Sequence, residues 1–85
     1  MKSLELYSRP GCHLCDELGE ALAPILRGRA EIRVINIDED IELKKRYGLR
    51  IPVLAAGDIE LSEFPLDVET VEAYLSENDK DVQSV

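Results

Sequence analysis

Polar and apolar residues alternate in two segments of the chain, which is the pattern of β-strands. Residues 3–7, SLELY, place Leu4 and Leu6 between polar neighbours. Residues 31–37, EIRVINI, carry apolar side chains at both alternating positions. A strand covered on both faces needs that distribution, so we expect the second strand in the interior of a sheet.

Two shorter apolar runs flank the pair Gly57-Asp58 in the segment 51–63, IPVLAAGDIELSE. A Gly-Asp pair is a common two-residue turn between antiparallel strands. The pattern therefore predicts a β-hairpin.

After the first strand, apolar residues recur at helical spacing, at Leu14, Leu18, Leu22 and Ile25. Proline lacks the N–H that a helix interior requires, so Pro24 predicts a kink or break near Ala23 and an end by Gly28. Two further helices are predicted at 38–48, capped by Asp38, and at 68–78.

The resulting order of elements is β-α-β-α-β-β-α. A strand-helix-strand crossover makes the first two strands parallel, whereas the hairpin makes the last two antiparallel. We therefore expect an α/β fold with a mixed four-stranded sheet covered by helices on both faces. Eighty-five residues suit one domain, which we place at 1–78, followed by a flexible C-terminal tail at 79–85.

The composition, 45% hydrophobic and 33% charged, is that of a globular protein. A net charge of -8 repels phosphate backbones and anionic lipid, so we expect neither nucleic acid nor a membrane as partner. The sequence shows no signal peptide or membrane span, which predicts a cytoplasmic location. We also expect a monomer. In that reducing compartment a permanent disulfide is the weakest reading of two nearby cysteines.

Both cysteines lie in YSRPGCHLC, residues 7–15, where the first strand gives way to a helix. Positions three apart on a helix lie one above the other, so Cys12 and Cys15 can form a disulfide. The helix N-terminus favours a thiolate at Cys12, and we expect the pKa of this thiol to lie below that of an ordinary cysteine. Arg9 and His13 can add positive charge or a hydrogen bond beside it.

A CxxC motif that opens the helix of a βαβ pattern indicates redox chemistry. Zinc is the main competitor, but a structural zinc site needs four ligands and this chain offers the two cysteines and at best His13. A complete metal site within the chain is therefore not expected.

The same motif resembles the Tyr-Ser-Lys-x-x-Cys-x-x-Cys active-site segment of glutaredoxins, and YGLRIPVL, residues 47–54, resembles their cis-proline segment. The likeness covers about 3–75 and is greatest to the compact bacterial glutaredoxin-like branch of the thioredoxin superfamily. It implies a thioredoxin-like fold in which Cys12 is the nucleophile and Cys15 the resolving thiol. It also implies a cis peptide bond before Pro52, which would turn the backbone of Ile51 toward a substrate.

The resemblance places Arg9 where the family has a glutathione-contacting lysine, and Arg50 is a second cation that could pair with a carboxylate. Where glutathione-using members have a Gly-Gly pair, however, this chain has LSEFPLD, residues 61–67. We therefore expect a thiol-disulfide oxidoreductase that needs no cofactor and acts on a disulfide-containing protein or a small-molecule thiol, with glutathione as a candidate reductant or co-substrate. An iron-sulfur carrier and a non-catalytic binding module stay open as alternatives.

Overall fold

The computed structural model describes the backbone of residues 2–83 and the side chains up to residue 76. Its elements follow the predicted order. They are β1 (Lys2–Ser8), α1 (His13–Leu26), β2 (Ala30–Asn36), the 3-10 turn η1 (Ile37–Glu39), α2 (Ile41–Tyr47), β3 (Val53–Ala56), β4 (Ile59–Ser62) and α3 (Val68–Gln83). The α/β fold class predicted from the sequence is confirmed.

The four strands form one mixed sheet in the order β2-β1-β3-β4. Strand β1 pairs in parallel with β2, and β3 runs antiparallel to both β1 and β4. Gly57 adopts a φ of +62° in the tight turn between β3 and β4, which is a conformation that glycine adopts at little cost. The predicted hairpin at Gly57-Asp58 is therefore confirmed.

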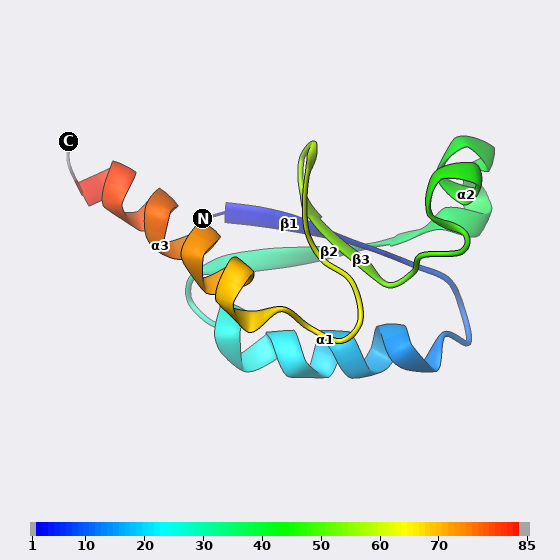
Figure 1. Cartoon of the computed structure of the whole chain (residues 1–85), viewed down its shortest axis with the longest axis horizontal. Coiled ribbons are helices and arrows are strands. Elements are labelled where there is room, and N and C mark those ends of the chain that lie inside the picture. Colours follow the sequence, from blue (N-terminus) through cyan, green and yellow to red (C-terminus); the bar gives the residue numbers. More distant parts are fainter. Residues whose placement is uncertain (1, 84–85) are drawn as a thin grey trace.

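Helices cover both faces of the sheet (Figure 1). Helices α1 and α3 pack on one face, where Leu4 and Leu6 of β1 join Leu18 and Leu22 of α1 in the main hydrophobic core. Helix α2 lies on the opposite face and contributes Tyr47 to a second cluster. That cluster contains Ile37, Tyr47 and Val53, with Tyr7, Leu43 and Ile51 packed against it.

The second strand is at the edge of the sheet, so the interior position expected from its sequence is wrong. Within the described sheet, β2 pairs with β1 alone. Ile32 and Val34 are 38% and 62% exposed. Ile37, at the end of this apolar segment, does not belong to β2. It lies in the turn η1 and is buried in the cluster that contains Tyr47 of α2.

Helix α1 is continuous through Pro24, so no break occurs near Ala23. Proline removes the hydrogen bond to the carbonyl four residues earlier, which belongs to Glu20. Glu20 is exposed, and water can satisfy its carbonyl. The helix ends at Leu26, two residues before Gly28, whose φ is +75°.

Two aspartates cap the later helices. Asp40, and not Asp38 as the sequence suggested, accepts the N–H groups of Glu42 and Leu43 at the start of α2. Asp67 accepts the N–H of Thr70 at 3.1 Å before α3, and hydrogen bonds from Thr70 hold the pKa of Asp67 below its usual range.

The flexible tail expected at 79–85 overlaps the end of α3, which runs through Gln83, and residues 84–85 lie outside the described part of the chain. Flexibility of this segment stays a prediction. None of the described helices is both long and apolar enough to cross a lipid bilayer.

Candidate functional site

Cys12 stands at the point where the loop after β1 becomes helix α1. Gly11, with a φ of +78°, reverses the chain just before it. Cys12 itself is extended and takes the N-cap position, the place that Ser, Thr, Asp or Asn usually occupies. Its Sγ accepts the backbone N–H of Cys15 at 3.1 Å, so sulfur does the work of a capping oxygen.

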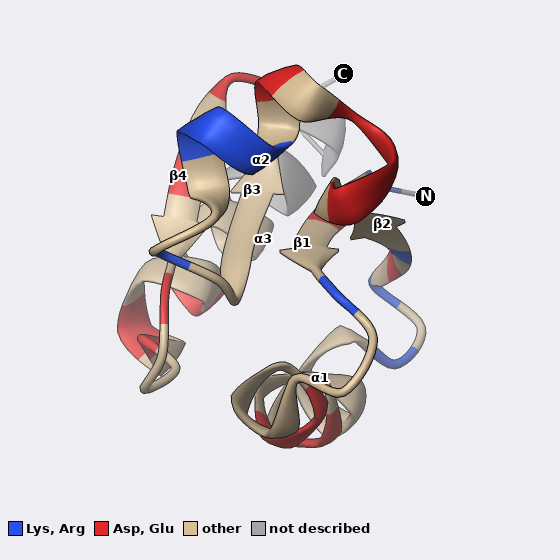
Figure 2. Ribbon diagram, turned by 90° about the vertical axis from the view of Figure 1, so that its right-hand side faces the viewer, with Lys and Arg blue, Asp and Glu red and all other residues tan. Residues whose placement is uncertain are grey.

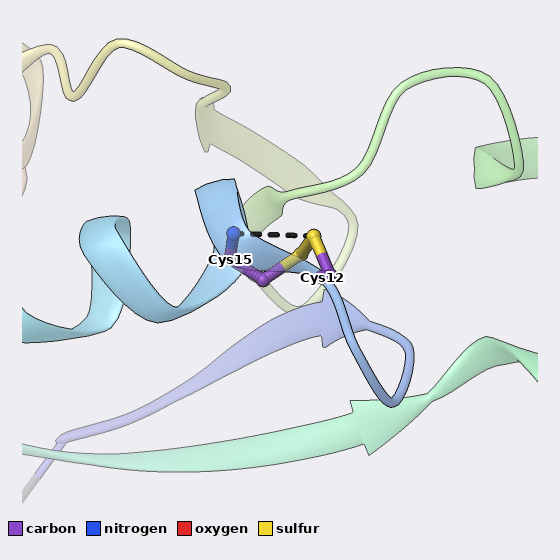
Figure 3. Close-up of a disulfide and its surroundings, with 2 residues drawn as sticks. All are labelled: Cys12 and Cys15. Atoms are coloured by element: carbon purple, nitrogen blue, oxygen red, sulfur yellow. Dashed lines mark hydrogen bonds between the residues drawn. A yellow bond between two sulfur atoms is a disulfide. The ribbon is translucent and has the colours of Figure 1, made fainter.

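The two cysteines are joined by a disulfide across the first turn of α1, with their Cα atoms 5.2 Å apart (Figure 3). They differ in exposure. Cys15 is 4% exposed and lies on the core side of the helix, whereas Cys12 is partly exposed at its end. A molecule arriving from solvent therefore meets Cys12 first.

The segment before β3 lies beside this disulfide. Tyr7 pairs with Val53 across the sheet, which brings the start of β3 to the end of β1, where the loop to Cys12 begins. The peptide bond between Ile51 and Pro52 is cis, and the Pro52 side chain is fully buried. The N–H of Ile51 donates to the carbonyl of Tyr47 at 3.1 Å, so this group already has a partner within its own loop.

Two tyrosines, Tyr7 and Tyr47, form a stacked pair, and Tyr47 belongs to the hydrophobic cluster against which Ile51 packs. The rings of Tyr7 and Tyr47 are 4.2 Å apart between centroids and inclined by 17°. Burial, followed by the electrostatic effect of Tyr47, raises the pKa of Tyr7 above that of an ordinary tyrosine. The pair fixes the end of α2, from which the chain continues to Arg50 and Pro52.

Arg9 lies in the loop between β1 and Cys12, and its side chain forms an ion pair with Asp38. One of its guanidinium nitrogens lies 3.0 Å from Asp38 Oδ1, and its backbone carbonyl accepts the N–H of Cys12 at 3.3 Å. Its Nε is buried and has no hydrogen-bond partner among the described residues. Arg9 thus holds the loop through its backbone and carries a positive charge partly balanced by Asp38.

His13 is the first residue of α1 and points into solvent, with its side chain 84% exposed. Its Nε2 lies 3.7 Å from a carboxylate oxygen of Glu17, one turn along the helix. When protonated, His13 would form a weak, screened ion pair there.

Arg50 lies between two carboxylates. Its Nη1 donates to Glu60 at 3.2 Å, its Nη2 donates to Glu63 at 2.9 Å, and Nη2 also reaches the second oxygen of Glu60. Its guanidinium also lies over the Tyr47 ring, 5.7 Å from the centroid. These hydrogen bonds from Arg50 lower the pKa of Glu60, so both members of that pair are charged at neutral pH.

The family of the chain follows from residues 3–76, which match the glutaredoxin-like domain (DUF836). The chain belongs to this glutaredoxin-like family. The match spans the CxxC loop, the cis-proline segment and all four strands.

Solved structures agree with the membership in the glutaredoxin-like family. A protein from Nitrosomonas europaea, solved by solution NMR, is 38% identical, with a TM-score of 0.77 over 86% of this chain and 89% of its own. A protein from X. campestris, solved by X-ray, is 41% identical, with a TM-score of 0.67 over 87% of this chain and 96% of its own. Both are structural genomics targets.

Thioredoxin 1 from Thermosipho africanus is more distant, at 17% identity and a TM-score of 0.60 over 91% of this chain and 98% of its own. That likeness shows the thioredoxin-like fold. No curated protein matches the chain.

The structure brings some of the predicted site residues together and gives others different partners. Cys12 and Cys15 are bonded, and the Pro52 segment approaches them through the pairing of β1 with β3. Sequence reasoning missed the carboxylates that pair with the two arginines, which are Asp38, Glu60 and Glu63. The only signal for them was opposite charge, which many residues of this chain share. Among the described residues no group of three His, Cys, Asp or Glu side chains could hold a metal ion.

Proposed function

We propose that this protein is a thiol-disulfide oxidoreductase that cycles between the Cys12–Cys15 disulfide and the dithiol. The observation that supports this most is the position of Cys12 at the N-cap of α1, where its sulfur accepts a backbone N–H. The same N–H and the helix dipole favour the thiolate once the disulfide is reduced. Cys15, buried one turn away, is within bonding distance of that sulfur and is shielded from other reagents.

In the reductive direction, the Cys12 thiolate attacks one sulfur of a substrate disulfide. A new S–S bond forms to Cys12, and the other substrate sulfur leaves as a thiolate that takes up a proton. Cys15 then loses its proton and attacks Cys12 Sγ, which releases the second substrate sulfur as a thiol. Two electrons have passed to the substrate, and the protein holds the disulfide seen in Figure 3. Two external thiols, themselves oxidised to a disulfide, restore the dithiol.

This cycle needs no metal or bound cofactor, and it suits the cytoplasm, where thiol donors are abundant. Disulfides of proteins and of small molecules are both chemically competent substrates. We assign substrate contact to Arg9 and His13, which flank Cys12 in the sequence, and to Arg50, Ile51 and Pro52 in the segment before β3.

The rate of thiol-disulfide exchange by the reduced protein tests the proposal. The reduced protein should release 2-thiopyridone from 2,2′-dithiodipyridine faster than free cysteine does at pH 7, because a larger fraction of Cys12 is thiolate. The oxidised protein is the control, and it should release no 2-thiopyridone. A rate equal to that of free cysteine would contradict the proposal.

The contacts of Arg50 argue against glutathione as the preferred thiol. Glu60 and Glu63 already occupy the guanidinium that a glutathione carboxylate would need, and their own charges repel that carboxylate. A disulfide-containing protein is the better candidate.

Removing those two charges should therefore improve the use of glutathione. In a Glu60→Gln/Glu63→Gln variant, Arg50 remains charged without a paired carboxylate. We expect the KM for glutathione in the reductive half of the cycle to fall about three- to tenfold. Glu39→Gln/Glu69→Gln, at two exposed positions, is the matched control for net charge. An unchanged KM in the double variant would show that Arg50 does not meet the reductant.

A further inference from the structure

A groove of about 690 Å³ runs between α1 and the edge strand β2. Leu6 and Val34 provide apolar surface from the sheet, and Gly19 and Ala23 line it from the helix. A second hollow of about 260 Å³ continues it past Ile32. The two hollows share Gly19 and Ala23, so together they follow the helix for several turns.

The groove exists because small helix residues face large strand residues. Ile32 and Val34 are in register with Leu4 and Leu6 of β1 and therefore point to the same face of the sheet. The two leucines are at most 3% exposed, whereas Val34 is 62% exposed. A Cβ built on Gly19 would meet nothing within 4 Å, so the space beside it is open.

The backbone next to the groove also lacks a neighbour. Within the described sheet, β2 pairs only with β1, so its outer edge presents main-chain N–H and C=O groups in the spacing that another strand would match. Extended peptides commonly bind by adding a strand to such an edge, with alternate side chains entering an adjoining pocket.

The acidic side chains beside the groove indicate which kind of peptide segment would bind there. Asp16, Glu17 and Glu20 lie along the helix side of the groove. Figure 2 looks nearly along α1 and shows acidic positions on its outer surface. A second copy of this chain, with a net charge of -8, would place acid against acid. A segment that carries lysine or arginine would be attracted.

One end of the groove reaches the redox centre, where its lining includes Cys15, His13 and Ser8. A chain held along β2 therefore has one end beside the Cys12–Cys15 disulfide. Strand β2 runs parallel to β1, so its C-terminal end lies next to the loop that carries Cys12.

From these observations we infer that the α1–β2 groove binds an extended segment of the substrate protein, whose groove-facing side chains, at every second position, are apolar residues and lysine or arginine. This inference rests on the proposed function and names its substrate class. The backbone pairs with the outer edge of β2, so side chains two positions apart enter the groove. Of these, the apolar side chains lie over Val34 and Ile32, and the lysine or arginine side chains reach the acidic side of α1. The groove thus holds the substrate while Cys12 carries out the exchange described above.

Single-turnover rates with matched substrates test the inference. Two synthetic peptides carry the same 2-thiopyridyl-activated cysteine after a segment in which every second residue is serine. The residues between the serines are valine and lysine in one peptide, and valine and glutamate in the other. The reduced protein should release 2-thiopyridone from the basic peptide about tenfold faster than from the acidic peptide, and high salt should shrink this ratio. Equal rates for the two peptides would overturn the inference.

Variants of the groove separate docking from chemistry. Gly19→Leu fills the groove from the helix side and should lower the rate with the basic peptide about tenfold, whereas Gly19→Ala, its matched control, should lower it little. Glu20→Lys should act like Gly19→Leu, and Glu69→Lys on α3 should not. The rate with 2,2′-dithiodipyridine should be the same in all four variants, because that small molecule does not need the groove.

The outcomes distinguish the two claims. If the wild-type protein reacts with 2,2′-dithiodipyridine no faster than free cysteine, the proposed function fails and the inference fails with it. If that reaction is fast but Gly19→Leu leaves the rate with the basic peptide unchanged, the inference alone fails. Binding of the basic segment without its cysteine should also slow amide hydrogen exchange along β2, and unprotected β2 amides would contradict the strand pairing.

Discussion

Cys12→Ser should abolish disulfide exchange, with a loss of at least about 10³-fold in the rate with 2,2′-dithiodipyridine. A serine hydroxyl can keep the N-cap hydrogen bond from Cys15, so the helix should still form. It cannot supply a thiolate, however, and the remaining thiol is buried. Stopped-flow absorbance of 2-thiopyridone measures the loss.

The control for Cys12→Ser is its thermal unfolding, compared with that of the reduced wild-type protein. Similar melting curves would assign the lost rate to chemistry and not to unfolding. A folded Cys12→Ser variant that reacted at the wild-type rate would show that Cys15, or some route not involving Cys12, is the attacking group.

Cys15→Ser should have the opposite signature, because it leaves the attack intact and removes the second step. The variant should release one equivalent of 2-thiopyridone from an activated peptide and then stop, with the peptide held on Cys12 as a mixed disulfide. The wild-type protein should instead release the peptide as a free thiol and end as the intramolecular disulfide. Intact mass after acid quenching distinguishes the two products.

A short time course separates the two steps in Cys15→Ser. Its first-step rate should lie within a few-fold of the wild-type rate, because the substitution keeps the backbone N–H of residue 15 that donates to Cys12 Sγ. Release of the peptide thiol by Cys15→Ser, at the wild-type rate and without an added thiol, would contradict the role of Cys15.

The local features of the fold were predictable from the sequence because local chemistry determines them. The spacing of Leu18 and Leu22 placed Cys15 on the buried side of α1, and Gly57 marked the hairpin turn. The position of β2 was not predictable in this way. Alternation records which side chains are apolar, but it does not record whether the outer edge of a strand has a neighbour. Ile37 made β2 resemble an interior strand, although it packs in the turn beyond it.

The positions of the two cysteines could also be predicted from the sequence. The ion-pair partners of the two arginines could not. A CxxC at a strand-to-helix junction places its thiols by helix geometry alone. The partners of Arg9 and Arg50 depend on the tertiary fold, since Asp38 is 29 residues from Arg9 and Glu60 is 10 residues from Arg50. Both arginines were expected to face a substrate, and the structure pairs each with carboxylates of the chain itself.

The most direct test of the account is the redox equilibrium of the two cysteines. The purified protein is equilibrated with a series of ratios of reduced to oxidised glutathione, quenched with an alkylating agent and weighed intact. We expect a reversible transition between a doubly alkylated dithiol and an unalkylated form that has lost two hydrogens, with a single midpoint. A protein that is never oxidised, or that keeps a glutathione adduct without resolving it, would contradict the Cys12–Cys15 cycle.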